Sequence, residues 1–462
     1  MDVFTAMQTA VSGLKAQAFS LENISGNIAN SQTTGFKRVD TNFVDLVAEQ
    51  APNRQVAGSV MANSRLTTTI QGNINATEVP TNIALNGEGF FVVQTKSGDA
   101  NNQTTFSSNN LYTRRGDFAP DKDGYLKNGG GAYLTGTSLD PVTGRATSEG
   151  PIQISTSTLP AKATTTINYS ANLPKTPATT NYSSTVAGSE LLPATGFATD
   201  PRITTGTGAA TVPATEASKL LANSIDGPSL TAYTTSGAPV TINTVWAKVQ
   251  NGNASATPAT NDVWNLFYQN NNAVTDTASA WTNAGTAFEF NSSGQLVTPA
   301  ATSVSVPNVT VNGINLGAIS VAYGAGGLTA YTATEATTRT LTQDGYSAGQ
   351  LNSVSVNSDG EVVGSYSNGN SIALAKIKVV QFTNPDGLKA DSSGNYLQTL
   401  DSGAPRVGLN GTTIEGSNIE QSNTDIASEF SKMIVTQQAY SANTKVISTA
   451  QDMMSALINI IR

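Results

Sequence analysis

The C-terminal segment EFSKMIVTQQAYSANTKVISTAQDMMSALINIIR, residues 429–462, is apolar at helical spacing almost to its last residue. Apolar residues at steps of three and four fall on one face of a helix. We therefore predict a helix over 425–462, with Thr424 or Asp425 as N-cap and Glu429 in the first turn. The candidate assembly residues of this helix are Phe430, Met433, Ile434, Tyr440, Ile447, Met454, Leu457, Ile458 and Ile461.

The first thirty residues repeat this pattern, and Asn30, Ser31 and the segment TTGF at 33–36 end it. At 1.5 Å per residue the two helices would be roughly 40 and 50 Å long, so they could lie side by side as a coiled-coil-like core. The sequence between the two helices predicts strands. The helices must therefore pack against each other or against another copy of the chain. The candidate assembly residues of the first helix are Phe4, Met7, Val11, Leu14, Leu21, Ile24 and Ile28.

Three polar residues interrupt the C-terminal apolar stripe. Gln437, Thr444 and Gln451 are spaced seven apart. Polar residues at such positions typically give up stability for register. We predict either that they let the helix slide or re-pair against a neighbouring helix, or that they face water.

The segment from about 40 to 420 predicts strands and turns. Asn368-Gly369 is a strong hairpin signal, and after it Ala375, Ile377 and Val379 alternate with lysines. The predicted fold class is α+β, mainly β, with paired terminal helices and nested discontinuous β domains.

A change in composition predicts the domain boundaries. Residues 163–340 contain 13 charged residues in 178, and Thr, Ala, Asn and Pro dominate. Low complexity raises the alternative of disorder, but scattered aromatic residues such as Trp246, Trp264 and Trp281 favour a packed core. The predicted parts are a helical domain at 1–30 and 425–462, linkers at 31–79 and 413–424, an inner β domain at 80–169 and 339–412, and an inserted outer β domain at 170–338.

The composition also excludes several functions. Charged residues make up 12% of the chain, the net charge is -8, and no Lys/Arg cluster is present to follow a phosphate backbone, so nucleic acid is not an expected partner. Cys and His are absent, which removes the common transition-metal ligands and the thiol and imidazole routes to catalysis. We expect no enzyme activity, metal or cofactor. The N-terminus lacks the basic residues of a cleaved signal peptide, so we expect none. The sequence also lacks a run of about 18 apolar residues, so we expect no membrane span.

Two distant motifs carry a family resemblance. SGLKAQAFSLENISGNIANSQTTGFKR at 12–38 and SEFSKMIVTQQAYSANTKVISTAQDMMSALINI at 428–460 resemble the paired terminal signature of bacterial flagellar rod and hook proteins. GEGFFVV at 87–93, YTRRGDFAPDKDGYL at 112–126 and GSYSNGNSIALAKIKVVQFTNPDGL at 364–388 are similar to hook members in particular. Together these segments cover about half of the chain.

The resemblance implies a structural subunit of the flagellar hook. Such a subunit would self-assemble into a helical tube around the export channel, a flexible universal joint that transmits torque from rod to filament. It would be exported without a cleaved signal peptide through the flagellar type III export apparatus and be extracellular. Its partners would be copies of itself, the rod, the hook cap protein and the hook-filament junction protein.

Two alternatives remain open. A distal rod protein shares the terminal helices but generally lacks a large insertion. A secreted β-rich enzyme or glycan-binding protein would account for the Thr/Asn-rich middle of the chain but not for apolar helices at both ends.

Overall fold

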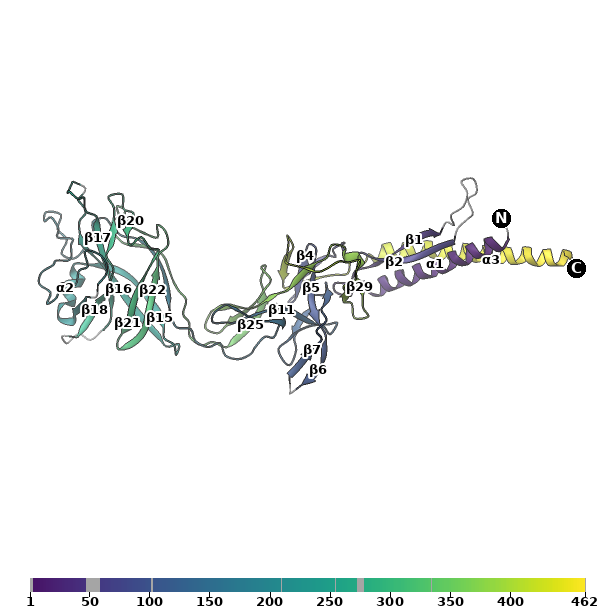
Figure 1. The fold of residues 1–462 in the computed structure, drawn as a ribbon, viewed down its shortest axis with the longest axis horizontal. Coiled ribbons are helices and arrows are strands. Elements are labelled where there is room, and N and C mark those ends of the chain that lie inside the picture. The colour runs from purple at the N-terminus through teal and green to yellow at the C-terminus, as the bar shows by residue number, and fades with distance from the viewer. Residues whose placement is uncertain are drawn as a thin grey trace. The chain divides into compact units, whose positions relative to one another are not determined.

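The chain folds into two compact units, one inserted into the other (Figure 1). The computed structural model describes residues 3–46, 59–100, 103–208, 210–253, 255–271, 278–333 and 335–461. Unit 1 comprises residues 1–157 and 351–462, and unit 2 comprises residues 158–350. The insertion is longer than the predicted 170–338 because Leu159 pairs with Gly349, and Lys162 with Tyr346, inside unit 2. No helix of the described part of the chain is long and apolar enough to cross a membrane.

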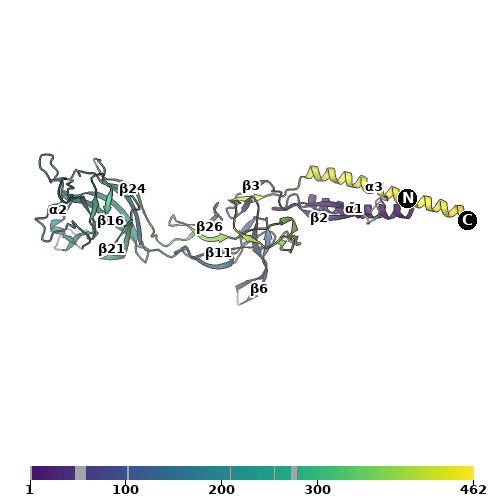
Figure 2. The same ribbon diagram turned by 45° about the horizontal axis from the view of Figure 1, so that its top comes forward.

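The two terminal helices form in unit 1 and pack against each other, as predicted. They are α1 (Val3–Ala29) and α3 (Ile426–Ile461), of 27 and 36 residues. Figures 1 and 2 both show α3 lying along α1. Asp425 is the N-cap of α3, since its Oδ1 accepts hydrogen bonds from the backbone N–H groups of Ala427 and Ser428. The predicted fold class, mainly β with paired terminal helices, is thereby confirmed.

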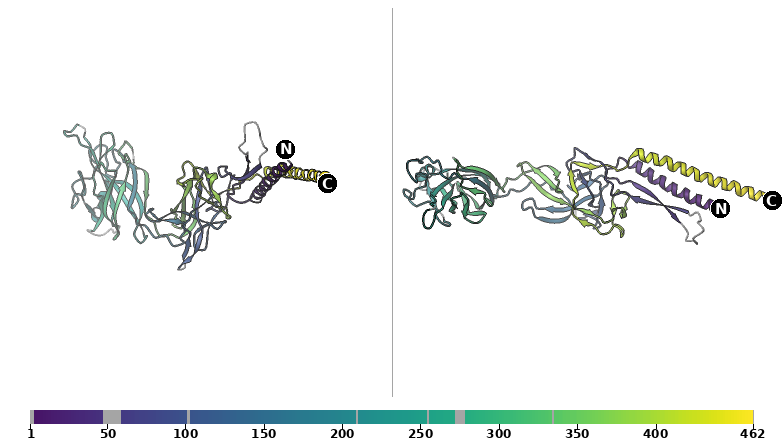
Figure 3. Two further views of the ribbon diagram at one scale, coloured as in Figure 1. Left: turned by 45° about the vertical axis from the view of Figure 1, so that its right-hand side comes forward. Right: turned by 90° about the horizontal axis from the view of Figure 1, so that it is seen from above.

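The segments predicted as linkers contain ordered strands. Strands β1 (Val39–Leu46) and β2 (Ser59–Leu66) form an antiparallel hairpin with Phe43 opposite Ala62 and Val44 opposite Met61. The right panel of Figure 3 shows this hairpin running along α1. Further along, β3 (Ile74–Ala76) pairs with β33 (Asn418–Glu420). Ordered strands therefore lie within both predicted linkers, 31–79 and 413–424, and the hairpin of the first one packs on α1.

The β body of unit 1 is a 13-stranded antiparallel assembly with short separate pairs beside it. Its main path runs β25-β26-β27-β11-β5-β8-β30-β29. Strands that precede the insertion in sequence therefore lie between strands that follow it. The hairpin predicted at Asn368-Gly369 joins β26 to β27, and Gly369 has a φ of 81°. The strands of the main path are β25 (Leu351–Val356), β26 (Glu361–Tyr366), β27 (Ser371–Ile377), β11 (Tyr133–Leu139), β5 (Phe90–Gln94), β8 (Leu111–Thr113), β30 (Tyr396–Leu397) and β29 (Lys389–Ala390).

Shorter strands complete unit 1. Those attached to the main sheet are β9 (Phe118–Pro120), β10 (Leu126–Asn128), β12 (Ala146–Pro151), β28 (Val379–Gln381) and β31 (Arg406–Val407). The separate pairs are β4 (Ile83–Asn86) with β32 (Thr413–Gly416), and β6 (Lys96–Ala100) with β7 (Gln103–Phe106). A 3-10 helix, η2, spans Pro385–Gly387. The core lies between these strands and is formed by side chains such as Phe91, Phe118 and Ile377.

Tight turns in both units use the same side-chain device. The Oδ1 atoms of Asp121, Asn291, Asn357 and Asp391 each accept hydrogen bonds from the backbone N–H groups two and four residues later. A glycine with positive φ stands three residues after each of them. Local side-chain acceptors of this kind favour turns over longer elements. The acidic segment at 121–124 is therefore a turn of this type.

Unit 2 contains two sheets that face each other across an apolar core. Its five-stranded sheet comprises β13 (Thr166–Asn172), β21 (Ser303–Val311), β22 (Ile314–Ala322), β23 (Leu328–Thr329) and β24 (Thr337–Gln343). Its seven-stranded sheet comprises β14 (Thr211–Pro213), β15 (Ile225–Tyr233), β16 (Pro239–Gln250), β17 (Asp262–Gln269), β18 (Ser279–Asn283), β19 (Phe288–Phe290) and β20 (Leu296–Thr298). The 3-10 helix η1 (Ala214–Glu216) leads into a short helix, α2 (Ala217–Ala222), which was not predicted.

The aromatic residues of unit 2 are buried, as the sequence predicted. Trp246 and Trp264 lie in the core shared by the two sheets, and Trp246 Nε1 donates a hydrogen bond to the hydroxyl of Tyr169 at 3.1 Å. Trp281 and Phe267 belong to a second cluster with residues of α2 and the loop before it. A segment that is sparse in charge is therefore ordered, because its few large side chains are gathered in two cores.

Candidate assembly interface

Small and polar side chains form the contact between the two terminal helices. The buried face of α1 comprises Ala10, Gly13, Ala16, Ser20, Ile24 and Asn27. A Cβ atom built on Gly13 would lie 3.0 Å from Nδ2 of Asn443, so glycine permits the close approach of α3 at this level. The pairs Asn27 with Glu429 and Gly13 with Asn443 are both separated by 14 residues in each helix, so the helices are antiparallel.

Asn27 fixes both helices to the hairpin. Its Nδ2 donates to the carbonyl of Val39 and to Oε2 of Glu429, both at 2.9 Å, and its Oδ1 accepts from the N–H of Val39 at 2.8 Å. The side-chain amide is buried and all of its donors and its acceptor are used. One residue therefore joins α1, β1 and the first turn of α3.

A second group of charges closes this corner. Lys432 Nζ lies 2.7 Å from Oε1 of Glu429 and 3.3 Å from Oδ1 of Asp40. Partial burial works to lower the pKa of Lys432, but the hydrogen bond to Glu429 and the charge of Asp40 outweigh it and leave that pKa raised. Lys432 therefore stays protonated and bridges α3 to β1.

Below the helices, a buried cluster of charges ties four chain segments together. Glu420 is fully buried; its carboxylate accepts hydrogen bonds from Nζ of Lys37, from Nη1 of Arg114 at 3.2 Å and from the N–H of Gly72 at 2.9 Å. Lys37 and Arg114 are 1% and 3% exposed. Lys37 also donates to the carbonyl of Ile70, and Arg114 to those of Leu85 and Gly87. We call Glu420, Lys37 and Arg114 the charge cluster.

Burial dominates the electrostatics of the charge cluster. It lowers the pKa values of Lys37 and Arg114, and Glu420 opposes this effect in both. Burial also raises the pKa of the neighbouring Tyr396 hydroxyl. Because the cluster contains two cations and one anion, the single carboxylate of Glu420 compensates both positive charges. The cluster therefore depends on Glu420 more than on either cation.

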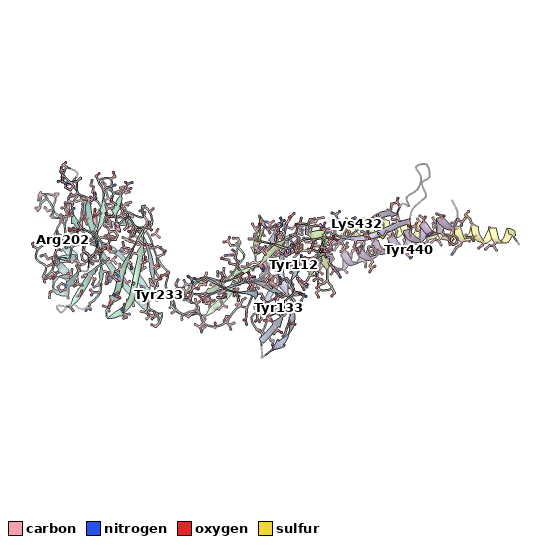
Figure 4. All side chains as sticks on the ribbon, viewed as in Figure 1. Tyr112, Tyr133, Arg202, Tyr233, Lys432 and Tyr440 are labelled. Carbon is pink, nitrogen blue, oxygen red and sulfur yellow. The ribbon has the colours of Figure 1, made fainter. Side chains whose placement is uncertain are left out.

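The outer surface of α3 carries apolar side chains on both sides of its contact with α1. By helical periodicity Ile426, Phe430, Tyr440 and Ile458 lie on one side, which we call the first shoulder, and Val435, Val446 and Met453 lie on the other, the second shoulder. All seven side chains are exposed. Tyr440 projects from the part of α3 that lies farther from the β body than Lys432 (Figure 4). The first shoulder also carries Gln437, Thr444 and Gln451, which are spaced seven apart between Phe430 and Ile458. Exposed apolar side chains on both sides of a helix are typical of a contact with another molecule.

The candidate residues of α1 divide into three groups. Phe4 and Val11 are exposed, Met7, Leu14, Leu21 and Ile28 are half-buried, and Ile24 is 4% exposed. Ile24 lies on the inward face of α1 between Ser20 and Asn27. All seven residues stay predictions of contact residues.

The candidate residues of α3 mostly remain accessible. Phe430, Ile434, Tyr440 and Ile458 are exposed, whereas Met433, Ile447 and Met454 are half-buried beside α1. The side chains of Leu457 and Ile461 lie outside the described residues. The polar residues Gln437, Thr444 and Gln451 are exposed. They are therefore not part of the contact between α1 and α3.

The sequence interpretation missed the residues that hold the helices in place. Glu420 is 383 residues from Lys37 and 306 from Arg114, and Asn27 is 402 from Glu429. Pairings over such separations leave no local pattern.

Both terminal segments and part of the β body match known families of flagellar proteins. Residues 7–37 match the family described as flagella basal body rod protein, residues 84–171 the flagellar hook protein FlgE/F/G D1 domain, and residues 415–460 the C-terminal part of flagellar basal body rod FlgEFG proteins. The chain is 30% identical over 470 residues to the flagellar hook protein FlgE of Brucella abortus, covering 100% of both chains.

More distant relatives bear the same name. The flagellar hook protein FlgE of Escherichia coli is 28% identical over 475 residues, which cover 98% of this chain and 100% of that protein. A crystal structure of the Helicobacter pylori flagellar hook protein FlgE2 aligns with a TM-score of 0.48 and 15% identity over 74% of this chain and 99% of that chain. Because the Brucella relative is 30% identical from end to end, the chain belongs to the family of flagellar hook proteins.

Proposed function

We propose that the exposed apolar residues of α1 and α3 drive polymerisation of this chain into a tube. As a member of the flagellar hook protein family, the chain is a structural subunit of the hook of the bacterial flagellum. The observation that carries the proposal is the pair of apolar shoulders on α3, which the subunit leaves exposed along the helix. Burying them between copies supplies roughly 25 cal/mol per Å² of apolar surface.

In this proposal the tube surrounds an export channel and acts as a flexible joint that transmits torque between rod and filament. The charge cluster supports the stiff part of this role, since it fixes the segments next to both helices to the β body. The side of α3 that faces away from α1 carries mostly polar residues, among them Gln438, Ser441, Lys445 and Asp452, and is suited to face water in the channel. The subunit would meet the rod, the hook cap protein and the hook-filament junction protein after passing through the type III export apparatus.

The first test concerns the terminal helices. The purified chain is expected to form tubes on concentration, whereas a variant without residues 1–30 and 426–462 is expected to remain a soluble monomer. The truncated chain keeps Lys37, Arg114 and Glu420, so its β body should stay folded. Negative-stain electron microscopy and analytical ultracentrifugation give the result. Tubes formed by the truncated chain would remove the helices as the cause, and absence of tubes from the intact chain would favour a secreted β-rich binding protein.

The second test concerns unit 2. Because Leu159 pairs with Gly349, the two crossings into unit 2 are adjacent, and residues 158–350 can be replaced by a short Gly-Ser linker. The shortened subunit is expected to be exported and to polymerise into straight or fragile tubes that do not support swimming. Hook shape by electron microscopy and motility in soft agar are the measurements. Curved hooks and normal swimming would show that unit 2 is dispensable and would favour a rod-like role.

A further inference from the structure

In the part of the chain that the structure describes, nothing packs on the outer face of the hairpin β1–β2. Among the described residues no third strand pairs with it, so both of its edges are open. One face lies on α1, where Asn23 Nδ2 donates to Thr41 Oγ1 at 2.8 Å and to Ser64 Oγ at 3.2 Å. Side chains alternate along a strand, so the opposed pair Val44 and Met61 lies on the other face, and both are exposed. A two-stranded ribbon is marginally stable alone and gains from further packing.

A groove of about 740 Å³ opens beside the same hairpin, between α1, β1 and the first turns of α3. Its apolar lining comes from all three elements: Ile24 at its floor, Val39 and Phe43 from β1, and Val435 from α3. Phe43 and Val435 are 47% and 65% exposed. These two large side chains therefore face solvent in a concave site where they could be buried.

The charges in the groove compensate one another. Arg38 lies 3.5 Å from Asp40, and Lys432 contacts both Asp40 and Glu429. Two cations and two carboxylates leave no net charge for an ionic ligand to neutralise. The groove therefore suits an apolar, uncharged surface.

We infer that the outer face of the hairpin and this groove are covered by a terminal helix of a second copy of this chain. Val435 belongs both to the groove and to the second shoulder, so the groove is continuous with the apolar surface that runs on through Val446 and Met453. A neighbouring copy seated on the second shoulder would thus reach the hairpin. The terminal helices of that copy offer exposed apolar residues such as Val11 and Phe430 for this contact. The inference rests on the proposed function, since it requires that the chain polymerises.

Thiol protection tests the inference, because the chain contains no cysteine. Phe43→Cys and Met61→Cys place single thiols in the groove and on the outer face of the hairpin, and Phe430→Cys places one on the first shoulder. Each variant is mixed with excess unaltered chain, so that a variant that polymerises poorly is still incorporated. Reaction with a maleimide is followed in the monomer and in sedimented tubes, with the unaltered chain as blank.

We expect all three thiols to react rapidly in the monomer. In the tube their reaction rate should fall about tenfold or more, because a buried group reacts only when the structure opens locally. Protection of Phe430→Cys with no change at Phe43→Cys and Met61→Cys would overturn the inference and leave the proposed function intact. Slow reaction of the two hairpin thiols already in the monomer would show that the chain covers them itself, which also overturns it. If no tubes form, both the inference and the proposed function fail.

Discussion

Replacing Glu420 with glutamine is expected to lower the free energy of unfolding of unit 1 by about 3–5 kcal/mol, because it leaves Lys37 and Arg114 buried without a compensating charge. The glutamine Nε2 is a hydrogen-bond donor, and it would face donors of Lys37, Arg114 or Gly72 instead of an acceptor. The three tryptophans of the chain all lie in unit 2, so tryptophan fluorescence during urea unfolding reports that unit alone. Native-state hydrogen exchange of β5 and β8 reports unit 1.

The matched control is Glu415→Gln. Glu415 lies five residues earlier, is partly exposed and accepts one hydrogen bond from Asn86 at 2.9 Å. Its replacement should change the stability of unit 1 by less than about 0.5 kcal/mol. Equal effects of the two substitutions, or an effect of Glu420→Gln on tryptophan fluorescence, would contradict the role given to the charge cluster.

The second large effect is expected from Phe430→Asp, which should abolish tube formation while leaving the monomer folded. Phe430 is 49% exposed in the subunit, so an aspartate there remains hydrated until a neighbour buries it. Burying the charge would cost at least about 3 kcal/mol per contact. That cost raises the concentration needed for assembly by about two orders of magnitude. Sedimentation of the polymer at increasing protein concentration gives this value.

Two controls accompany this variant. Phe430→Leu keeps an apolar side chain and should assemble, whereas Gln438→Asp adds the same charge on the polar side of α3 and should also assemble. Assembly of Phe430→Asp at the normal concentration would show that the first shoulder does not meet a neighbour. Phe430 is a better test than Leu21 or Ile447, because those side chains are half-buried and charge there would also disturb the contact of α1 with α3.

The sequence predicted the elements whose signals are local. The helices followed from their apolar spacing, the N-cap from Asp425, and the β26–β27 hairpin from Asn368-Gly369. The face that each helix turns inward was not predicted. The inward faces use small and polar residues such as Ala10, Gly13 and Thr436, because close packing of two helices favours small side chains. Several larger apolar residues of the pattern, such as Phe4, Val11 and Phe430, remain exposed.

The remaining differences arise from long-range pairing. Within the segment 31–79, which has little apolar periodicity, β1 and β2 pair and lie on α1, to which Asn23 and Asn27 hold them. Unit 2 begins earlier and ends later than predicted, because Leu159 and Gly349, 190 residues apart, pair as bridge partners. Single residues that act across such distances carry no spacing that a sequence pattern can reveal.

The difference in length between the two terminal helices makes the two ends of the pair unequal. With Asn27 beside Glu429 at the base, residues 454–461 of α3 extend about 12 Å beyond Val3, where α1 begins. Among the described residues, these last turns have no companion helix in their own subunit. In a polymer of identical copies they are therefore left to pack against another copy, whereas the base of the pair is already held by its own β body through the charge cluster.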